Sequence, residues 1–393
     1  MVNDRFNMEC YFCEDILVSI FLRLPARSLL RFKCLSRSWN CVFSDPKFIR
    51  NHIKTTSCQQ NHKDFLLLYR DRHHLPPALS WLRIDACFDG RRGGGLEAQD
   101  VESPFETSDT VLCTAHCVDG ILCTFTRNNS SHIVSAVVWN PVTKEHKRFP
   151  GTGPVYRSEA FGFGYDSVIG DYTVIHIEYR KNWRNIQSLR LKADGWNAAH
   201  DNVPYCFGIT FFDQMATAVN GCLYWIAWKQ DDRGRNLCGV ILCFDLERET
   251  LREETSLCGQ GIFYEDYQSV LAGDFKRNKF IRGVLILFGN SLCLARTYDD
   301  VYLDLFLMEE NEMTKTKYWV PYARMHTGNT VYPPLYVTRN GDMLANEQGK
   351  AGLFIFYREG SSRTKKVAIQ GLRLSYESFY VIPYVESLIS PFT

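Results

Sequence analysis

The stretch LRLPARSLLRFKCLSRSWNCVFSDPKFIRNHI, residues 22–53, decides how the chain is interpreted. Apolar side chains recur at helical spacing over residues 14–24, and Pro25 ends this helix because proline disfavours a helical residue before it. The pattern predicts two more short helices, over residues 26–32 and 36–43. This part of the chain is therefore expected to be a row of short helices.

A fourth helix has a clear start signal at Asp45-Pro46. An aspartate at the N-cap can accept a hydrogen bond from a backbone amide at the start of the helix. A proline suits the first helical position, because its missing N–H has no partner there anyway. We therefore expect a helix from residue 46 onward.

These helices carry more apolar surface than they can bury among themselves. A module of roughly 40 residues usually needs outside help to be stable. The surplus predicts a partner surface, where burial contributes about 25 cal/mol per Å² of apolar area. The candidate residues of this surface are Phe12, Ile16, Leu17, Ile20, Leu24, Pro25 and Leu29. Spacing alone leaves open which of them face a partner, and the alternative is that they pack on the rest of the chain.

Beyond about residue 60 the pattern changes from helices to strands. Short apolar runs bounded by turn residues follow one another, among them FLLLYR, IVSAVVWN, YTVIHIEY, VILCFDL, LFLM and LFIFYRE. Four turns precede a strand in the same way, and Asn-Gly and Asp-Gly favour tight hairpins. These turns are Asp119-Gly120, Asn220-Gly221, Gly289-Asn290 and Asn340-Gly341. Their spacing fits a repeat of about 50 residues, which is typical of propeller blades, and we expect about six blades.

The predicted fold class is therefore α+β multidomain. A small all-α module over residues 10–55 precedes a linker with the first strands and a long variable loop over residues 56–110. A large all-β propeller follows over residues 111–390.

Residues 12–53 resemble an F-box of the plant type. The motifs that carry the resemblance are Arg23-Leu24-Pro25, Ser28-Leu29-Leu30-Arg31-Phe32, Trp39 and Ser44-Asp45-Pro46 with Phe48. The resemblance places Leu24 and Pro25 at the partner and Trp39 inside the module. The family usually has Leu-Pro or Phe-Pro where this chain has Phe12-Cys13, which implies a less fixed start of the first helix and a lower adaptor affinity.

Much of residues 110–390 resembles the plant F-box-associated domain, which is kelch-like. Its motifs here are Val138-Trp139-Asn140-Pro141, Gly162-Phe163-Gly164-Tyr165-Asp166, Asp171-Tyr172, Val219-Asn220-Gly221, Leu223-Tyr224-Trp225 and Phe244-Asp245. Proteins of this family act as substrate receptors of SCF-type cullin–RING ubiquitin ligases. The F-box holds a Skp-type adaptor, and the associated domain holds the target protein.

The resemblance thus implies a non-catalytic receptor subunit that directs a target to ubiquitination and proteasomal degradation. Some relatives are S-locus F-box proteins of self-incompatibility, and nothing in the sequence selects that role. A non-degradative role of the same two modules is a further alternative.

Target binding is expected on loops, because loops on a rigid scaffold carry specificity. The long segment over residues 70–106 is the first candidate, with Trp81 and Phe88 as aromatic contacts. Trp183 and Trp196 are the second candidates. The alternative for the long segment is an insert without a role.

Charge and composition limit the choice of partners. The net charge is +1, so no bulk field favours nucleic acid or a membrane. The start of the chain lacks an apolar signal segment, and the fifteen cysteines are therefore expected to be reduced thiols in the cytoplasm or nucleus.

We expect no cofactor and no metal. Cys10-x-x-Cys13 has no second ligand pair at zinc-finger spacing. The glycine runs at residues 90–95 and 162–164 lack the other residues of a nucleotide-binding loop. A propeller that binds a small molecule or a sugar is the less favoured alternative, because it would need convergent polar groups that no local pattern shows.

Overall fold

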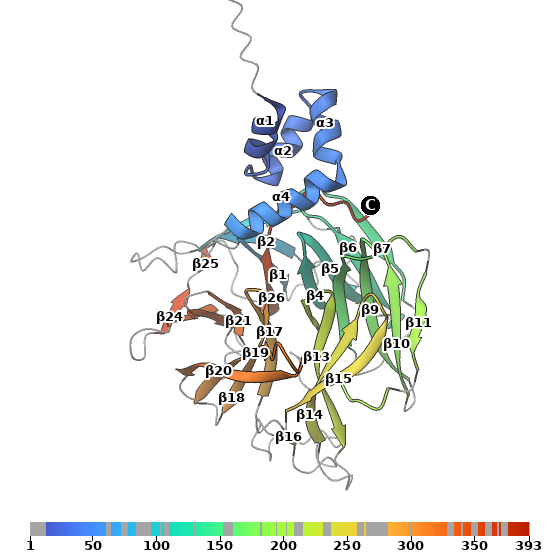
Figure 1. The fold of residues 1–393 in the computed structure, drawn as a ribbon, viewed down its shortest axis with the longest axis vertical. Helices are drawn as coiled ribbons and strands as arrows, with labels where there is room; N and C mark the ends of the chain where they lie inside the picture. The colour runs from blue at the N-terminus through green and yellow to red at the C-terminus, as the bar shows by residue number, and fades with distance from the viewer. Residues whose placement is uncertain are drawn as a thin grey trace, which may run out of the picture.

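The computed structural model describes residues 13–59, 64–71, 78–83, 96–102, 104–105, 110–128, 130–151, 160–180, 183–193, 195–201, 203–207, 215–230, 237–257, 263–264, 282–298, 301–327, 334–338, 341–346, 353–357, 364–367, 369–370 and 376–392. Over these ranges four helices stand on a ring of six β-sheets (Figure 1). This arrangement confirms the predicted helical module and the predicted propeller of six blades.

The helical module consists of α1 (Glu14–Phe21), α2 (Ala26–Lys33), α3 (Arg37–Ser44) and α4 (Pro46–Gln59). The start of α4 confirms the signal in the sequence, since Asp45 Oδ1 accepts hydrogen bonds from the amides of Lys47 at 2.7 Å and Phe48 at 3.1 Å. Ser36 caps α3 in a similar way, with its hydroxyl accepting from the Ser38 amide at 3.2 Å. The first helix ends at Phe21, earlier than the pattern predicted, in a turn that leads to the proline.

An aromatic core holds the module together. Phe43 has no exposed surface, and its ring centroid lies 5.1 Å from Phe21, 5.3 Å from Phe48 and 5.9 Å from Trp39. Trp39 itself meets Phe21 edge-on at 4.8 Å. The aromatic residues of α1, α3 and α4 therefore meet at one point, which fixes the angles between these short helices.

Five blades are built from strands that follow one another in the chain. The first two of these hold β4 (Thr110–Val118), β5 (Ile121–Asn128), β6 (Val134–Trp139) and β7 (His146–Phe149), then β8 (Ala160–Asp166), β9 (Asp171–Arg180), β10 (Trp183–Arg190) and β11 (Asn197–His200). The next holds β12 (Thr217–Val219), β13 (Cys222–Gln230), β14 (Leu237–Asp245) and β15 (Thr250–Ser256), with β16 (Phe263–Tyr264) paired to β14. The last two hold β17 (Arg282–Phe288), β18 (Ser291–Tyr298), β19 (Tyr302–Glu310) and β20 (Lys317–His326), then β21 (Pro334–Val337), β22 (Met343–Asn346), β23 (Leu353–Phe356) and β24 (Thr364–Val367).

The remaining blade joins the two ends of the propeller. It is formed by β1 (Asp64–Asp71), β2 (Ala78–Arg83), β3 (Leu96–Val101) and the C-terminal strand β26 (Tyr376–Tyr384), with β25 (Ile369–Gln370) parallel to β3. β26 pairs antiparallel with β1 along its whole length. We call this pairing of β1 with β26 the ring seam. The region assigned to a linker with first strands thus supplies three strands of a blade.

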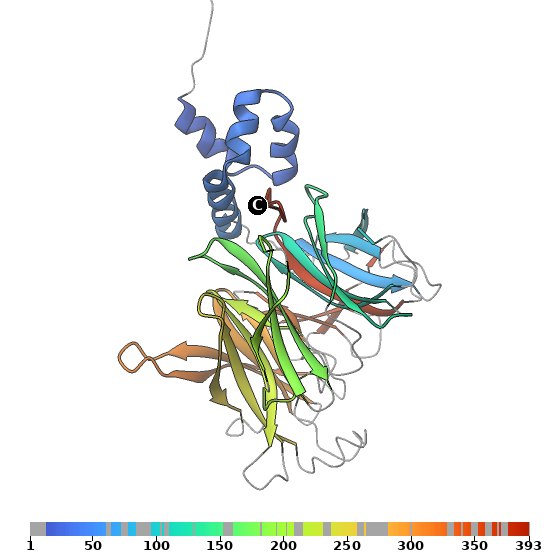
Figure 2. The same cartoon turned by 90° about the vertical axis from the view of Figure 1, so that its right-hand side faces the viewer.

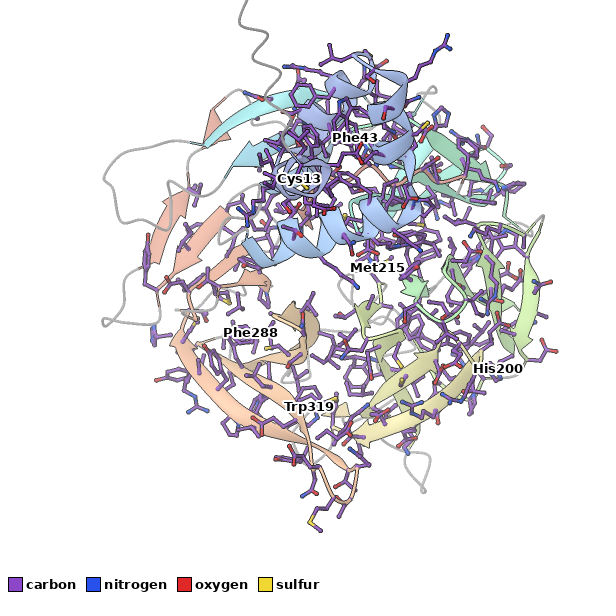
Figure 3. All side chains as sticks on the ribbon, turned by 45° about the horizontal axis from the view of Figure 1, so that its top comes forward. Cys13, Phe43, His200, Met215, Phe288 and Trp319 are labelled. Atoms are coloured by element: carbon purple, nitrogen blue, oxygen red, sulfur yellow. The ribbon has the colours of Figure 1, made fainter. Side chains whose placement is uncertain are left out.

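The six innermost strands neighbour one another in turn around the centre of the ring. They are β26, β4, β8, β12, β17 and β21. In Figure 3 the ring is seen from the side of the helical module, with α4 lying over one part of it. The module therefore sits on one face of the propeller.

Two kinds of turn recur among the blades. The hairpin turns at Asp119-Gly120 and Asn220-Gly221 have positive φ at both residues, 53° and 78° in the first and 48° and 75° in the second, which confirms the tight hairpins predicted there. Gly289 and Gly341 have positive φ at the corresponding turns, while Asn340 lies outside the described residues.

The second kind of turn joins the two outer strands of a blade. In three blades an Asn or Asp side chain opens this turn by accepting two amide hydrogen bonds, and the residue four positions later has positive φ. Asn140 accepts from Val142 and Thr143, Asp245 from Glu247 and Arg248, and Asn311 from Met313 and Thr314. These three outer turns thus share one design.

Gly162 and Gly164 serve blade packing. A Cβ atom on Gly162 would lie 2.8 Å from the side chains of Leu223 and Trp225, and one on Gly164 would lie 2.7 Å from Leu246. The two glycines therefore let the neighbouring blade approach closely.

The cysteines depart from expectation at one position. Most described cysteines are free, among them the fully buried Cys243 and Cys293. Cys238 is disulfide-bonded, so the expectation of reduced thiols is wrong at this residue.

Candidate functional site

The first helix of the module leaves an apolar face uncovered. Ile16 and Ile20 are 51% and 46% exposed, one turn apart on α1. No residue of α1 is fully buried, and Val18 and Phe21 on its other side pack against the core. This exposed pair is the clearest candidate partner surface among the described residues of the module.

The other predicted surface residues lie at different depths. Leu17 and Leu24 are half-buried, and Pro25 is exposed at the start of α2. Leu29 has no exposed surface and belongs to the core, so its burial removes it from the candidate surface. Phe12 lies outside the described residues.

A hydrogen bond from α4 holds the turn before α2 in place. His52 on α4 is fully buried and its Nε2 lies 2.7 Å from the carbonyl oxygen of Leu24. Because the partner is a carbonyl oxygen, Nε2 carries the hydrogen and donates it. Burial lowers the pKa of His52, against the opposing effect of this hydrogen bond. The neutral imidazole therefore positions the turn that presents Pro25.

Sequence reasoning missed one exposed apolar residue of the module. Leu35, in the turn after α2, is 74% exposed. It follows the last helical apolar position, so helical periodicity did not select it. To predict that Leu35 is exposed, one would have to know where α2 ends.

The buried side of the module rests on the propeller. Leu29 and Phe43 belong to one continuous apolar cluster with Leu66 of β1, Trp139 of β6 and Tyr384 of β26. The apolar surplus of the helices is thus divided. One part packs on the propeller, as the alternative interpretation held, and Ile16 and Ile20 remain exposed.

A half-buried arginine connects α4 to two blades. Arg50 Nη1 donates to Asp119 Oδ2 at 2.9 Å and to the Tyr172 hydroxyl at 3.1 Å, and that hydroxyl donates to Asp119 Oδ2 at 2.9 Å. The guanidinium also lies 3.6 Å from the ring centroid of Tyr165. Burial opposes the charge on Arg50, but Tyr172 and Asp119 together raise its pKa. We call Arg50, Asp119, Tyr165 and Tyr172 the α4 clasp.

Residues 385–392, the C-terminal tail, form a second connection between module and propeller. Glu386 forms an ion pair with Arg27 on α2, with 2.8 Å between Arg27 Nε and the Glu386 carboxylate. The fully buried amide of Asn140 donates to the carbonyl oxygens of Ser387 at 3.0 Å and Ile389 at 2.8 Å. The tail therefore runs between the helical module and the propeller (Figure 2). It forms an ion pair with α2 and hydrogen bonds with the neighbouring blade.

Trp81 belongs to this junction and not to a loop surface. It is 9% exposed, meets Tyr384 edge-on at 4.7 Å, and carries the Arg27 guanidinium 4.5 Å above its ring. Its burial removes Trp81 from the candidate target surface, where the sequence had placed it. The cause is that β2 turns this side chain toward the helices.

The structure does not bring the other candidate target residues together with Trp81. Phe88 lies outside the described residues, and Trp183 is the first residue of β10. Trp196 is half-buried, and its indole Nε1 donates to the carbonyl oxygen of Pro150 at 2.8 Å, which ties two neighbouring blades together. Target binding by Phe88, Trp183 and Trp196 stays a prediction.

Within the described ranges no group of three or more His, Cys, Asp or Glu side chains is placed to hold a metal ion. No helix in these ranges is both long and apolar enough to span a membrane. Cys10 of the Cys10-x-x-Cys13 pair lies outside the described residues, and Cys13 is a free, exposed thiol.

Comparison with known families agrees with this geometry. Residues 94–385 match the F-box associated beta propeller domain, and residues 11–51 match the F-box domain. The chain therefore belongs to the F-box proteins that carry an F-box associated β-propeller.

Its relatives include F-box proteins of Arabidopsis thaliana. A putative F-box protein is 26% identical over 262 residues, which cover 63% of this chain and 61% of that protein. An F-box/kelch-repeat protein is 23% identical over 263 residues, which cover 63% of this chain and 67% of that protein. The chain thus spans 61% of the length of the first of these relatives.

Solved structures resemble the chain only distantly. SapL1 lectin in complex with α-methyl fucoside has a TM-score of 0.39 and 10% identity, over 81% of this chain and all of that one. A lectin of Aleuria aurantia has a TM-score of 0.39 and 11% identity, over 80% of this chain and 97% of that one. TM-scores this low carry no argument about fold or ligand.

Proposed function

We propose that the chain is the substrate-recognition subunit of an SCF-type ubiquitin ligase. The F-box binds a Skp-type adaptor through the exposed side of α1, with Ile16 and Ile20 at its centre and Leu17, Leu24 and Pro25 at its margin. The propeller binds a target protein and brings it to the ligase for ubiquitination and degradation. The exposed pair on α1, inside the segment that matches the F-box domain, is the observation that carries the proposal.

The physical argument starts from the division of apolar surface. A folded module that has already packed one side on the propeller gains nothing further from Ile16 and Ile20 unless a partner covers them. Burying an isoleucine side chain contributes about 1.5–3 kcal/mol, so two half-exposed isoleucines supply useful affinity. The propeller contributes to the chemistry by proximity, because it raises the effective concentration of the target at the ligase. The chain itself acts as a non-catalytic adaptor, in the cytoplasm or nucleus.

A trapping experiment tests this function. The full chain with Ile16→Asp and Ile20→Asp should lose the adaptor, keep its fold, and accumulate targets that are no longer degraded. Proteins captured by this variant should be ubiquitinated in a reconstituted reaction with the wild-type chain and not with the variant. Val168→Asp is the matched control, because Val168 is 70% exposed on the propeller and should leave both activities unchanged.

Two outcomes would count against the proposal. Loss of adaptor binding in the Val168→Asp control to the same extent would show that the effect is not specific to α1. Captured proteins that the wild-type chain leaves unmodified, with unchanged turnover in cells, would favour a non-degradative or S-locus-type recognition role.

A further inference from the structure

The segments that close the ring are the same segments that hold the F-box. Helix α4 ends at Gln59 and β1 begins at Asp64, so one side of the ring seam follows directly from the F-box. The other side, β26, ends at Tyr384 and continues into the C-terminal tail. Both strands of the seam therefore lead into contacts with the helical module.

The α4 clasp anchors the first of these segments. The side chains of Arg50 and Asp119 are 30% and 28% exposed, so their ion pair is partly shielded from water. Hydrogen bonds to charged groups are stronger than those between neutral groups. Tyr172 is 1% exposed and joins the same triangle of hydrogen bonds from another blade. A shift of α4 would break both hydrogen bonds of Arg50 and leave only the bond between Tyr172 and Asp119.

The C-terminal tail anchors the second segment. Leu388 and Ile389 are 3% and 4% exposed, and Ser387 has no exposed surface. A Cβ atom on Gly120 would lie 2.4 Å from the carbonyl oxygen of Val385, so the tail is packed tightly on the β4–β5 turn. That turn also contains Asp119 of the α4 clasp. The C-terminal tail and the α4 clasp therefore both contact the β4–β5 turn.

The apolar core is continuous across the junction. Ala26 and Leu29 of α2 lie in one cluster with Leu66 of β1 and with Ile382 and Leu388 of β26 and the tail. The helical module and the ring seam share this core. They are therefore expected to open together, because opening either one exposes the same apolar surface.

We propose that the F-box and the ring seam form one cooperative unit, in which the seated F-box holds β26 on β1 and adaptor binding strengthens closure of the ring. The adaptor part of this inference rests on the proposed function. Because coupling between sites is reciprocal, the closed ring also favours the orientation of the F-box that the adaptor binds. Binding at one end of the chain thus stabilises the scaffold of the target-binding end.

Amide hydrogen exchange of the full chain tests the coupling. The variant Arg50→Ala/Glu386→Ala removes one charged contact from each anchor and leaves α1 untouched. It should speed exchange at β1 and β26 by roughly tenfold or more, since one charged hydrogen bond is worth at least a factor of ten. Exchange in β13 and β14, on a distant blade, should not change.

Lys144→Ala is the matched control for a lost ion pair. Lys144 and Glu102 pair at 2.6 Å but are 70% and 73% exposed, so this change should leave the seam unaffected. Unchanged exchange at β1 and β26 in the double variant would overturn the inference. Equal acceleration in β13 and β14 would also overturn it, because it would indicate general destabilisation.

A second comparison adds a saturating Skp-type adaptor. Exchange at β1 and β26 should slow in the wild-type chain and remain unchanged in the double variant. An adaptor that binds the wild-type chain without slowing exchange at the seam would contradict the coupling. Failure of the adaptor to bind at all would count against the proposed function, and the first comparison alone would then decide whether F-box and seam are one unit.

Discussion

The amide group of Asn140 distinguishes two turns that look alike in the sequence. In its turn Asn140 accepts hydrogen bonds from two amides, as Asn311 does in another blade and as Asp245 does with a carboxylate. Asn140 alone is fully buried and also donates, to the carbonyl oxygens of Ser387 and Ile389. Asn140→Asp keeps the acceptors and removes these donors.

The expected cost follows from the buried carbonyls. Two carbonyl oxygens would lose their partner, at about 1–3 kcal/mol each, and would face a carboxylate. We expect the free energy of unfolding at pH 7 to fall by about 3–5 kcal/mol. Asn311→Asp should change it by no more than about 0.5 kcal/mol, because Asn311 is exposed and its turn needs only an acceptor.

The pH dependence identifies the cause. The new carboxyl group at position 140 should have a folded-state pKa above its unfolded value of about 3.9, because the neighbouring carbonyl oxygens disfavour the charge. The destabilisation should therefore be smallest below pH 4, where the group is protonated in both states and can donate one hydrogen bond. It should grow as the pH rises through the unfolded pKa and level off above the folded pKa.

Urea unfolding of wild type and both variants at pH 4 and pH 7 provides the measurement. A loss of stability in Asn140→Asp that is equal at the two pH values would refute the reasoning about the donated bonds. So would an equally large loss in Asn311→Asp.

Two further changes test other parts of the structure. Asp45→Ala removes the N-cap of α4 and should lower the free energy of unfolding by about 1 kcal/mol in urea, and an unchanged midpoint would show that the cap contributes nothing. A hydrogen bond from Cys243 and the charge of Arg252 lower the pKa of Cys222, while burial raises the pKa of Cys117 to about 12. Iodoacetamide should therefore alkylate the thiolate of Cys222 at pH 7 and should leave Cys117 unmodified. A Cys222 that is alkylated no faster than Cys117 at pH 7 would contradict this assignment.

Local signals in the sequence predicted the elements well. Asp45-Pro46 marked the start of α4, and Asp119-Gly120 marked a hairpin, because caps and tight turns depend on residues next to one another. The number of blades followed from the spacing of such turns. These features needed no knowledge of contacts between distant parts of the chain.

The junction could not be predicted in the same way. Arg50 meets Asp119 and Tyr172, which are 69 and 122 residues away in the chain. Trp81 lies in an ordinary strand pattern, and only the placement of α2 and β26 over it shows that it is buried. Leu29 has the same helical spacing as the exposed isoleucines, so spacing could not separate the buried side of the module from its exposed side.

The affinity for a Skp-type adaptor tests the central claim most directly. The full chain and the variant Ile16→Ala/Ile20→Ala are titrated by calorimetry, with Val168→Ala as the control for an exposed apolar residue on the propeller. Covering two half-exposed isoleucines is worth about 2 kcal/mol in total, so the double variant should bind roughly 30-fold more weakly while unfolding at the same temperature. A wild-type chain that forms no complex, or a double variant that binds as tightly as wild type, would contradict the assignment of α1 as the adaptor surface.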